Sequence, residues 1–297
     1  METPPANSRS ERQSMQYGTA FPSTPAFDQS LVGPRARALE NAGFDYITLS
    51  GHLLSARSGR YEGRPDSQYA LPYHDPFILF SYIAALTTRI HMISSIVILP
   101  LRETAAVARQ AAELASLSNG RFEMGVGLSW QEAEYRAVGQ NLHERGARLA
   151  EQVEVLRLYW SQPHVTFKGR FHDIDDLGLG ILPARPIPIW FGTTFNDASM
   201  KRAAALGDGW MPIADPTGSM PQFQTYMTQA GRDPGSMRVM GRLVAGEDGS
   251  EAWVAEGKRL QSLGVTHITI DPPLGLDVEK GIERVAAARE ILRKAVL

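Results

Sequence analysis

Cysteine is absent from the 297-residue chain. Its absence excludes disulfide bonds, thiol nucleophiles and metal sites with thiolate ligands, and it agrees with a reducing compartment. Long apolar runs are missing too, because no stretch approaches the roughly 18 apolar residues that a membrane span requires. We therefore expect a cytoplasmic protein that makes no contact with a membrane.

The chain also lacks an excess of charge. Its formal net charge is −2, and its lysines and arginines form no cluster interleaved with aromatic residues. A nucleic-acid partner is therefore not expected. Residues 1–13 are polar and have no apolar run of the signal-peptide kind. We expect a disordered tail there, followed by a single domain over residues 14–297.

Motifs for hydrolysis and metal binding are missing as well. The sequence has no His-Glu-x-x-His segment, no Gly-x-Ser-x-Gly segment, and no carboxylates and histidines at the spacing of metal ligands. We expect no metal in the site.

What the sequence does contain is an alternation of short apolar runs and helical patterns. The apolar runs cover residues 15–20, 44–49, 91–99, 121–127, 187–192, 208–213, 237–244 and 266–270. The helical patterns cover residues 27–41, 75–88, 105–117, 144–160, 198–206, 220–230, 251–263 and 278–297. This order predicts an α/β fold of the (β/α)8 TIM-barrel type, with an irregular insertion at 161–186 after the fourth helical region.

A doubly wound open sheet is the competing fold. It normally carries a Gly-x-Gly-x-x-Gly turn after its first strand, but residues 21–25 contain no glycine, and 125–130 lack the third one. The barrel is therefore favoured.

The segment from Gly120 to Trp130 is the clearest unit of this barrel. Asn119 and Gly120 tolerate the left-handed conformation that ends a helix, and the following residues alternate as in a strand that ends at Gly127. Active sites of such barrels lie at the carboxyl ends of the strands. Those positions are rich in Gly, Ser and Thr here, which suits the binding of an organic cofactor that performs the chemistry. Arg121, Glu123 and the segment 208–210 lie at the opposite strand ends, so we expect them to be structural.

Several segments in a fixed order carry a resemblance. They are Ala42-Gly43-Phe44-Asp45, His52, Leu86-Thr87-Thr88-Arg89-Ile90, the run from Ser94 to Pro100, Ala108-Arg109-Gln110-Ala111-Ala112-Glu113-Leu114, Leu117-Ser118-Asn119-Gly120-Arg121-Phe122, Gly125-Val126-Gly127, Trp130, Glu134-Tyr135, the run from Ile187 to Gly192, and Gly207-Asp208-Gly209-Trp210. Over about residues 15–295 the sequence resembles the bacterial luciferase-like (LLM class) flavin- or deazaflavin-dependent oxidoreductases.

The resemblance implies an enzyme that binds coenzyme F420, with FMN as the alternative. With F420 it would transfer a hydride to or from a small organic substrate. With FMN it would be a two-component monooxygenase that uses reduced flavin and O2, and a separate flavin or F420 reductase is an implied partner. The family is often dimeric, so a homodimer is expected. A cofactor-binding barrel without turnover is the alternative of another class.

The resemblance also implies where the cofactor lies. A non-prolyl cis peptide, at Ser95-Ile96 or Ser94-Ser95, would support the ring. The expected cofactor-binding residues are Ser50, Ser94, Ser95, Ile96, Gly127, Leu128, Ser129, Trp130, Gly192, Thr193 and Thr194. The last three precede a helix, where exposed amides bind phosphate. Trp130 could instead pack the loop, and residues 192–194 could form a plain turn.

His52 is the expected catalytic residue, because a histidine can protonate a substrate near neutral pH. Deazaflavin-dependent relatives often have Asp before this His, but here Gly51 takes its place. His52 could therefore also be a structural loop residue. The long loops 50–73 and 161–186 carry several arginines and could close over the mouth of the barrel. The alternative, favoured for any single residue, is solvated surface.

Overall fold

The computed structural model describes residues 14–22, 28–65 and 69–296, so the expected tail lies outside the described residues. Eight parallel strands form a closed barrel in the order β1-β10-β9-β8-β7-β4-β3-β2. They are β1 (Gln16–Ala20), β2 (Tyr46–Gly51), β3 (His91–Ile98), β4 (Phe122–Gly127), β7 (Ile189–Thr193), β8 (Gly209–Pro212), β9 (Arg238–Val244) and β10 (His267–Asp271). The prediction of a (β/α)8 barrel is confirmed.

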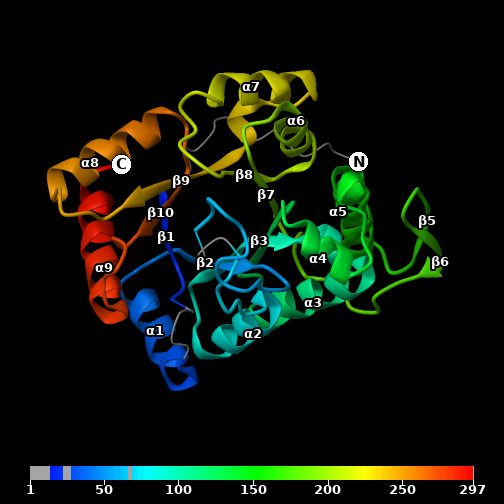
Figure 1. The fold of residues 1–297 in the computed structure, drawn as a ribbon, viewed down its shortest axis with the longest axis horizontal. Coiled ribbons are helices and arrows are strands. Elements are labelled where there is room, and N and C mark those ends of the chain that lie inside the picture. The colour runs from blue at the N-terminus through cyan, green and yellow to red at the C-terminus, as the bar shows by residue number, and fades with distance from the viewer. Residues whose placement is uncertain (1–13, 23–27, 66–68, 297) are drawn as a thin grey trace, which may run out of the picture.

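Helices surround the barrel (Figure 1). They are α1 (Gln29–Asn41), α2 (Pro76–Leu86), α3 (Thr104–Leu117), α5 (Arg145–Ser161), α6 (Asp197–Leu206), α7 (Met220–Gln229), α8 (Ser250–Ser262) and α9 (Val278–Ala295). Aspartates cap α1, α2 and α9, where the carboxylates of Asp28, Asp75 and Asp277 accept backbone N–H groups of the first turn. As expected, α3 ends at residues with positive φ, Asn119 at 54° and Gly120 at 77°.

Two elements differ from the prediction. The insertion is not irregular, because it contains an antiparallel hairpin of β5 (Val165–Lys168) and β6 (Asp173–Leu177), which projects beyond α5 in Figure 1. These strands are short and mostly exposed, so they leave no apolar run in the sequence. A six-residue helix, α4 (Glu132–Ala137), follows β4 and is too short to show a helical period.

A small apolar core fills the barrel itself, apart from the larger core between strands and helices. It consists of Tyr46, Ile93, Trp190, Met211 and Met240, with Ile96 packed against it. The two aromatic rings occupy the half nearest the strand starts, and the methionines and Ile96 lie toward the carboxyl ends. The barrel is therefore closed below and lined by flexible apolar side chains above. In the described part of the chain, no helix has the length and apolar character needed to cross a membrane.

Candidate cofactor site at the barrel mouth

Two adjoining cavities open at the carboxyl ends of the strands. Their volumes are about 270 Å³ and about 380 Å³. Of the predicted residues, the first cavity is lined by Ser50, His52, Ser95 and Ile96, the second by Ser129 and Trp130, and both by Leu128, Gly192, Thr193 and Thr194. Most of the predicted cofactor-binding residues thus meet at one place, but Ser94 and Gly127 line neither cavity.

The floor of the first cavity is a bulge in β3. The peptide bond between Ser95 and Ile96 is cis, and the pairing of β3 with β4 shifts between Ile93 and Val97. The Ile96 side chain lies so close to two glycines that a Cβ atom at Gly127 or Gly192 would come within 2.9 Å or 2.7 Å of it. Ile96 therefore packs directly against Gly127 and Gly192, and the cofactor-binding role expected of Gly127 stays a prediction.

Ser94 has a structural position. It is fully buried, and its hydroxyl donates to the Gly125 carbonyl at 2.9 Å and accepts the Gly125 N–H at 2.8 Å. It joins β3 to β4 below the bulge, and its expected cofactor-binding role stays a prediction.

His52 has an acidic partner after all. Its Nδ1 lies 3.1 Å from Oε2 of Glu134, a residue of α4 that is buried in the structure. Oε1 of Glu134 accepts the N–H groups of Leu53 and Leu54, so the carboxylate also fixes the loop that follows β2. The contact favours the tautomer with its proton on Nδ1, which makes Nε2 the nitrogen for a ligand in the cavity.

The setting of this pair is partly apolar. The Tyr73 ring stacks on His52 with 4.8 Å between centroids. Burial, with a smaller effect of the Glu134 charge, raises the pKa of the Tyr73 hydroxyl, so this group stays protonated at neutral pH. The sequence showed Glu134 as part of the family pattern, but the distance of 82 residues between Glu134 and His52 concealed their contact.

The second cavity is basic. Arg145 of α5 and Arg202 of α6 both line it. Among the described residues, no carboxylate lies within ion-pair distance of either guanidinium group. Burial, with the charge of Arg145 as the lesser cause, lowers the pKa of Arg202. Two like charges without a counter-ion favour the binding of an anion.

The start of α6 faces the same cavity. Asn196, the capping residue, accepts the N–H of Ser199 at 3.0 Å, and both residues line the cavity beside Thr194. Free N–H groups and the helix dipole at such a start favour a phosphate group. Gly192 and Thr193 still belong to β7, and residues 192–194 line both the first cavity and this basic one.

Trp130 lies both at the candidate cofactor site and in the packing of a loop. It lines the second cavity, and it also packs the loop after β2, with the Arg64 guanidinium carbon 3.9 Å from its ring centroid and the Tyr61 ring at 4.9 Å. The loop after β2 thus lies against the mouth, as expected.

The second long loop, residues 161–186, does not lie against the mouth of the barrel. Lys168 pairs with Asp173 inside the hairpin, and Arg170 pairs with Glu144. Arg185 lines a separate cavity of about 510 Å³ together with residues at the amino ends of β8 and β9. The expectation that 161–186 covers the mouth is wrong, because the hairpin is held on the outer side of α5.

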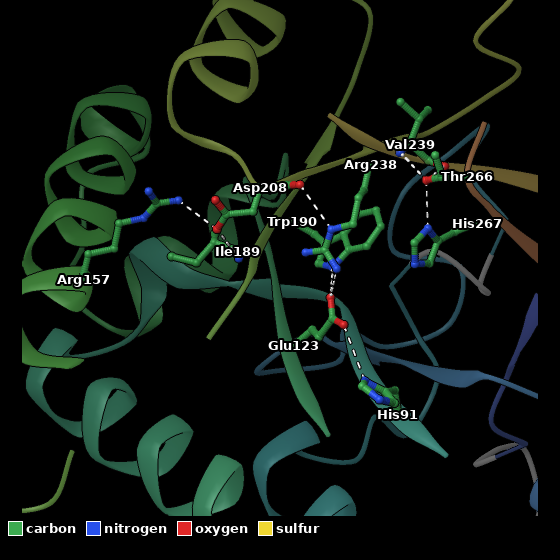
Figure 2. A network of polar contacts seen from close by, with 10 residues as sticks. All are labelled: His91, Glu123, Arg157, Ile189, Trp190, Asp208, Arg238, Val239, Thr266 and His267. Atoms are coloured by element: carbon green, nitrogen blue, oxygen red, sulfur yellow. Dashed lines mark hydrogen bonds and ion pairs between the residues drawn. The ribbon is translucent and has the colours of Figure 1, made fainter. Parts of the chain in front are cut away.

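The amino ends of the strands hold a buried polar network (Figure 2). Glu123 Oε2 accepts Trp190 Nε1 at 2.6 Å and Arg238 Nη1 at 2.8 Å, and His91 Nδ1 lies 3.5 Å from Oε1. Burial alone would raise the pKa of Glu123, but the hydrogen bond with His91 and the Arg238 charge outweigh it and lower this pKa to about 2. Burial lowers the pKa of the neighbouring His267 to about 4.

Arg121 completes this end of the barrel. Its side chain donates to the carbonyl groups of Ala84, Thr87, Ile90 and Ser118. The structural interpretation of Arg121 and Glu123 is confirmed. In the ranges that the structure describes, no group of three acidic, histidine or cysteine side chains is placed to hold a metal ion.

Comparisons with known proteins identify the family of the chain. The model of the luciferase-like monooxygenase family matches residues 15–264. The chain belongs to this family. It is 30% identical over 250 residues to an uncharacterised protein of Mycobacterium tuberculosis, which covers 82% of this chain and 85% of that protein. It is 29% identical to the F420-dependent hydroxymycolic acid dehydrogenase of the same species, over 84% of this chain and 67% of that protein.

Solved structures show the same fold. An F420-dependent secondary alcohol dehydrogenase superimposes with a TM-score of 0.75 at 18% identity, covering 94% of this chain and 99% of that one. The monooxygenase RslO1 of Streptomyces bottropensis superimposes with a TM-score of 0.70 at 19% identity, covering 95% and 98%. The luciferase-like family includes F420-dependent dehydrogenases and monooxygenases, so the protein is an oxidoreductase of this group.

Proposed function

We propose that the protein is an oxidoreductase that uses coenzyme F420 to transfer a hydride to or from a small organic substrate. The observation that carries the proposal is the pairing of two cavities at the mouth. One has an apolar floor formed by Ile96. The other is lined, beside the start of α6, by two guanidinium groups that have no carboxylate partner among the described residues. A flat ring and a phosphate, joined by a short chain, fit this pair of environments.

The residues present can hold such a cofactor without a metal. Ile96 and Leu128 would contact the ring, and Arg145 with Arg202 would bind the phosphate. Thr193 and Thr194 line both cavities and would face the chain that joins ring and phosphate. When bound, the deazaflavin would supply the hydride chemistry. The protein would contribute position, exclusion of water and the movement of one proton.

His52 would move that proton at Nε2. Glu134 would hold the imidazole in place through Nδ1 and stabilise its protonated form, as an acidic partner of a histidine commonly does. Gly51 removes the acid that deazaflavin-dependent relatives often carry beside this histidine, and Glu134 supplies one from α4. This arrangement weakens the main argument for a barrel without turnover.

Two relatives named above favour F420 over FMN, since both the hydroxymycolic acid dehydrogenase and the secondary alcohol dehydrogenase are described as F420-dependent. The second candidate is an FMN-dependent two-component monooxygenase that uses O2. The RslO1 likeness and the family's description support it. In either case a separate reductase is a proposed partner.

We also propose a homodimer in the cytoplasm. Ile78 and Tyr82 are 70% and 53% exposed on the outer side of α2, and a second copy that covered them would remove apolar surface from water. The lack of cysteine agrees with a reducing compartment.

Fluorescence titration tests the cofactor directly. The purified protein is titrated in parallel with F420 and with FMN, each oxidised and reduced. The proposal expects selective binding of the deazaflavin in both redox states. Selective binding of reduced FMN would favour the monooxygenase, and binding of neither would reject both functions.

A further inference from the structure

The hydroxyl group of Ser129 contacts a buried carboxylate at the mouth of the barrel. Ser129 follows β4, is buried, and lines the second cavity. Its Oγ lies 3.3 Å from Oε2 of Glu134, the same oxygen that lies 3.1 Å from Nδ1 of His52. Because His52 lines the first cavity, these three side chains form a chain of polar contacts that runs from one cavity to the other.

The contacts of Ser129 fix the direction of its hydroxyl hydrogen. Oγ accepts the N–H of Gln131 at 3.0 Å, the turn that a serine often makes with the residue two positions further on. An ionised carboxylate can only accept hydrogen bonds, so the contact with Glu134 requires the hydroxyl to donate. The one hydrogen of Ser129 is therefore directed to Glu134, and in this arrangement it is not available to a phosphate group.

The two oxygens of Glu134 are held by different parts of the chain. Oε1 accepts the N–H groups of Leu53 and Leu54, and Oε2 contacts Ser129 and His52. Glu134 is 1% exposed, and within the described ranges it forms no ion pair with a lysine or arginine. A buried charged group depends on its hydrogen bonds. Without the Ser129 hydroxyl, Oε2 would keep the imidazole as its one partner among the described residues.

We propose that Ser129 is a positioning residue, which directs the Glu134 carboxylate toward His52. Oε2 then holds the imidazole proton on Nδ1, and Nε2 remains an acceptor for a proton in the first cavity. The inference rests on the proposed function, in which His52 moves that proton. The alternative is the cofactor-binding role that the resemblance implies for Ser129, because a hydroxyl group in the wall of the second cavity could also donate to a phosphate.

Nuclear magnetic resonance of the cofactor-free protein tests the inference without turnover. Histidine labelled with 15N is incorporated, and the ring signals of His52 are assigned by their absence from His52→Asn. At pH 8 we expect separate signals from a protonated Nδ1 and an unprotonated Nε2. In Ser129→Ala the two signals should move toward each other, because the proton is then shared between the nitrogens. Mixed tautomers in the wild type, or unchanged signals in Ser129→Ala, would overturn the proposal.

Two further variants separate a specific role from a general loss of packing. Ser129→Thr keeps a hydroxyl group, and we expect it to restore the wild-type signals of His52. The matched control is Ser118→Ala, since Ser118 is also buried, precedes β4 instead of following it, and donates to the Ala115 carbonyl at 3.3 Å. It should leave the His52 signals unchanged. Failure of the threonine variant, or an equal change in Ser118→Ala, would contradict the proposal.

Cofactor titration separates the two roles of Ser129. F420 and FMN are titrated into Ser129→Ala and the wild type, with riboflavin as the ligand that lacks a phosphate. We expect unchanged affinities, and in turnover a kcat about tenfold lower with an unchanged KM, as for the loss of one hydrogen bond to a charged group. Binding of FMN or F420 about tenfold weaker, with riboflavin unaffected, would assign Ser129 to the phosphate and overturn the proposal.

Failure of the proposed function would look different from failure of this inference. In that case the wild type binds neither F420 nor FMN, while the signals of His52 still depend on the Ser129 hydroxyl. The contact chain would then position His52 for another reaction.

Discussion

The polar side chains at the two ends of the barrel differ in whether they have charged partners within the chain. At the amino ends of the strands, Glu123 has polar contacts with Trp190, Arg238 and His91 (Figure 2). At the carboxyl ends, Arg145 and Arg202 face an open cavity without a carboxylate among the described residues. One end has partners within the chain, and the other leaves its groups for a ligand.

This difference separates stability from function. A buried charge whose partner is removed costs several kcal/mol, so the network around Glu123 contributes to folding as a unit. The guanidinium groups at the mouth repel each other, and among the described residues neither has a carboxylate partner, so a bound anion would stabilise both. Substitutions at the amino end should therefore change the free energy of unfolding, and substitutions at the mouth should change binding and turnover.

The largest expected effect is at the amino end. Glu123→Ala leaves the guanidinium of Arg238 and the indole N–H of Trp190 without their acceptor in the interior. We expect the free energy of unfolding, measured by urea denaturation, to fall by about 3–5 kcal/mol. The control is Glu132→Ala, which breaks an exposed ion pair with Arg136 and should cost less than about 0.5 kcal/mol. A similar small loss for both variants would contradict the account of this end.

A fall in pH should reduce the stability contributed by the polar side chains at the same end of the barrel. The pKa of His267 is about 4 in the folded protein, below its usual 6.5, so the unfolded chain binds a proton first as the pH falls. The free energy of unfolding is then unaffected by His267 above pH 6.5 and decreases between pH 6.5 and 4, by about 3 kcal/mol in all.

Glu123 extends the loss to lower pH. Its folded pKa of about 2 lies below the usual 4.5, so its contribution is complete above pH 4.5 and disappears as the pH falls toward 2. Urea denaturation at pH 7.5, 5.5 and 4.5 checks the first part, with His267→Gln as the variant that flattens the curve. A wild-type protein equally stable at pH 7.5 and 4.5 would be inconsistent with a buried neutral His267.

At the mouth, the largest effect is expected on turnover. His52→Asn removes the group proposed to move the proton, and we expect kcat/KM to fall about 100-fold, with the free energy of unfolding changed by less than about 1 kcal/mol. Steady-state kinetics over a range of pH measures this loss.

Glu134→Gln is the companion variant. Its amide oxygen can still accept the N–H groups of Leu53 and Leu54, while the negative charge beside His52 is lost. We expect cofactor binding to be retained and kcat/KM to fall, because the carboxylate that holds the His52 imidazole in place is lost. An unchanged kcat/KM would show that Glu134 holds only the loop.

The smallest effect concerns the phosphate. Arg202→Gln should weaken the binding of F420 or FMN about tenfold and leave the weaker binding of riboflavin, which has no phosphate, unchanged. Arg136→Gln, an exposed arginine on α4, is the control. Equal losses for FMN and riboflavin would place the phosphate elsewhere.

The sequence predicted the fold more completely than the site. Apolar runs report burial directly, so all eight barrel strands could be placed, and the stop at Asn119 and Gly120 followed from backbone conformation alone. The cis peptide at Ser95–Ile96 was predicted only from the resemblance to the luciferase-like family. Two features depend on how distant segments meet in the closed barrel: the contact between Glu134 and His52, and the cavity that Arg145 and Arg202 both line. Charged residues on helices are ordinary surface residues in a sequence, and only their shared cavity distinguishes them.

The crystal structure of the protein with F420 bound would test the difference between the two ends most directly. The account predicts the ring over Ile96 in the first cavity, the phosphate in contact with Arg145 and Arg202, and the network around Glu123 unchanged. A cofactor bound instead in the cavity beside Arg185, at the amino ends of the strands, would contradict it.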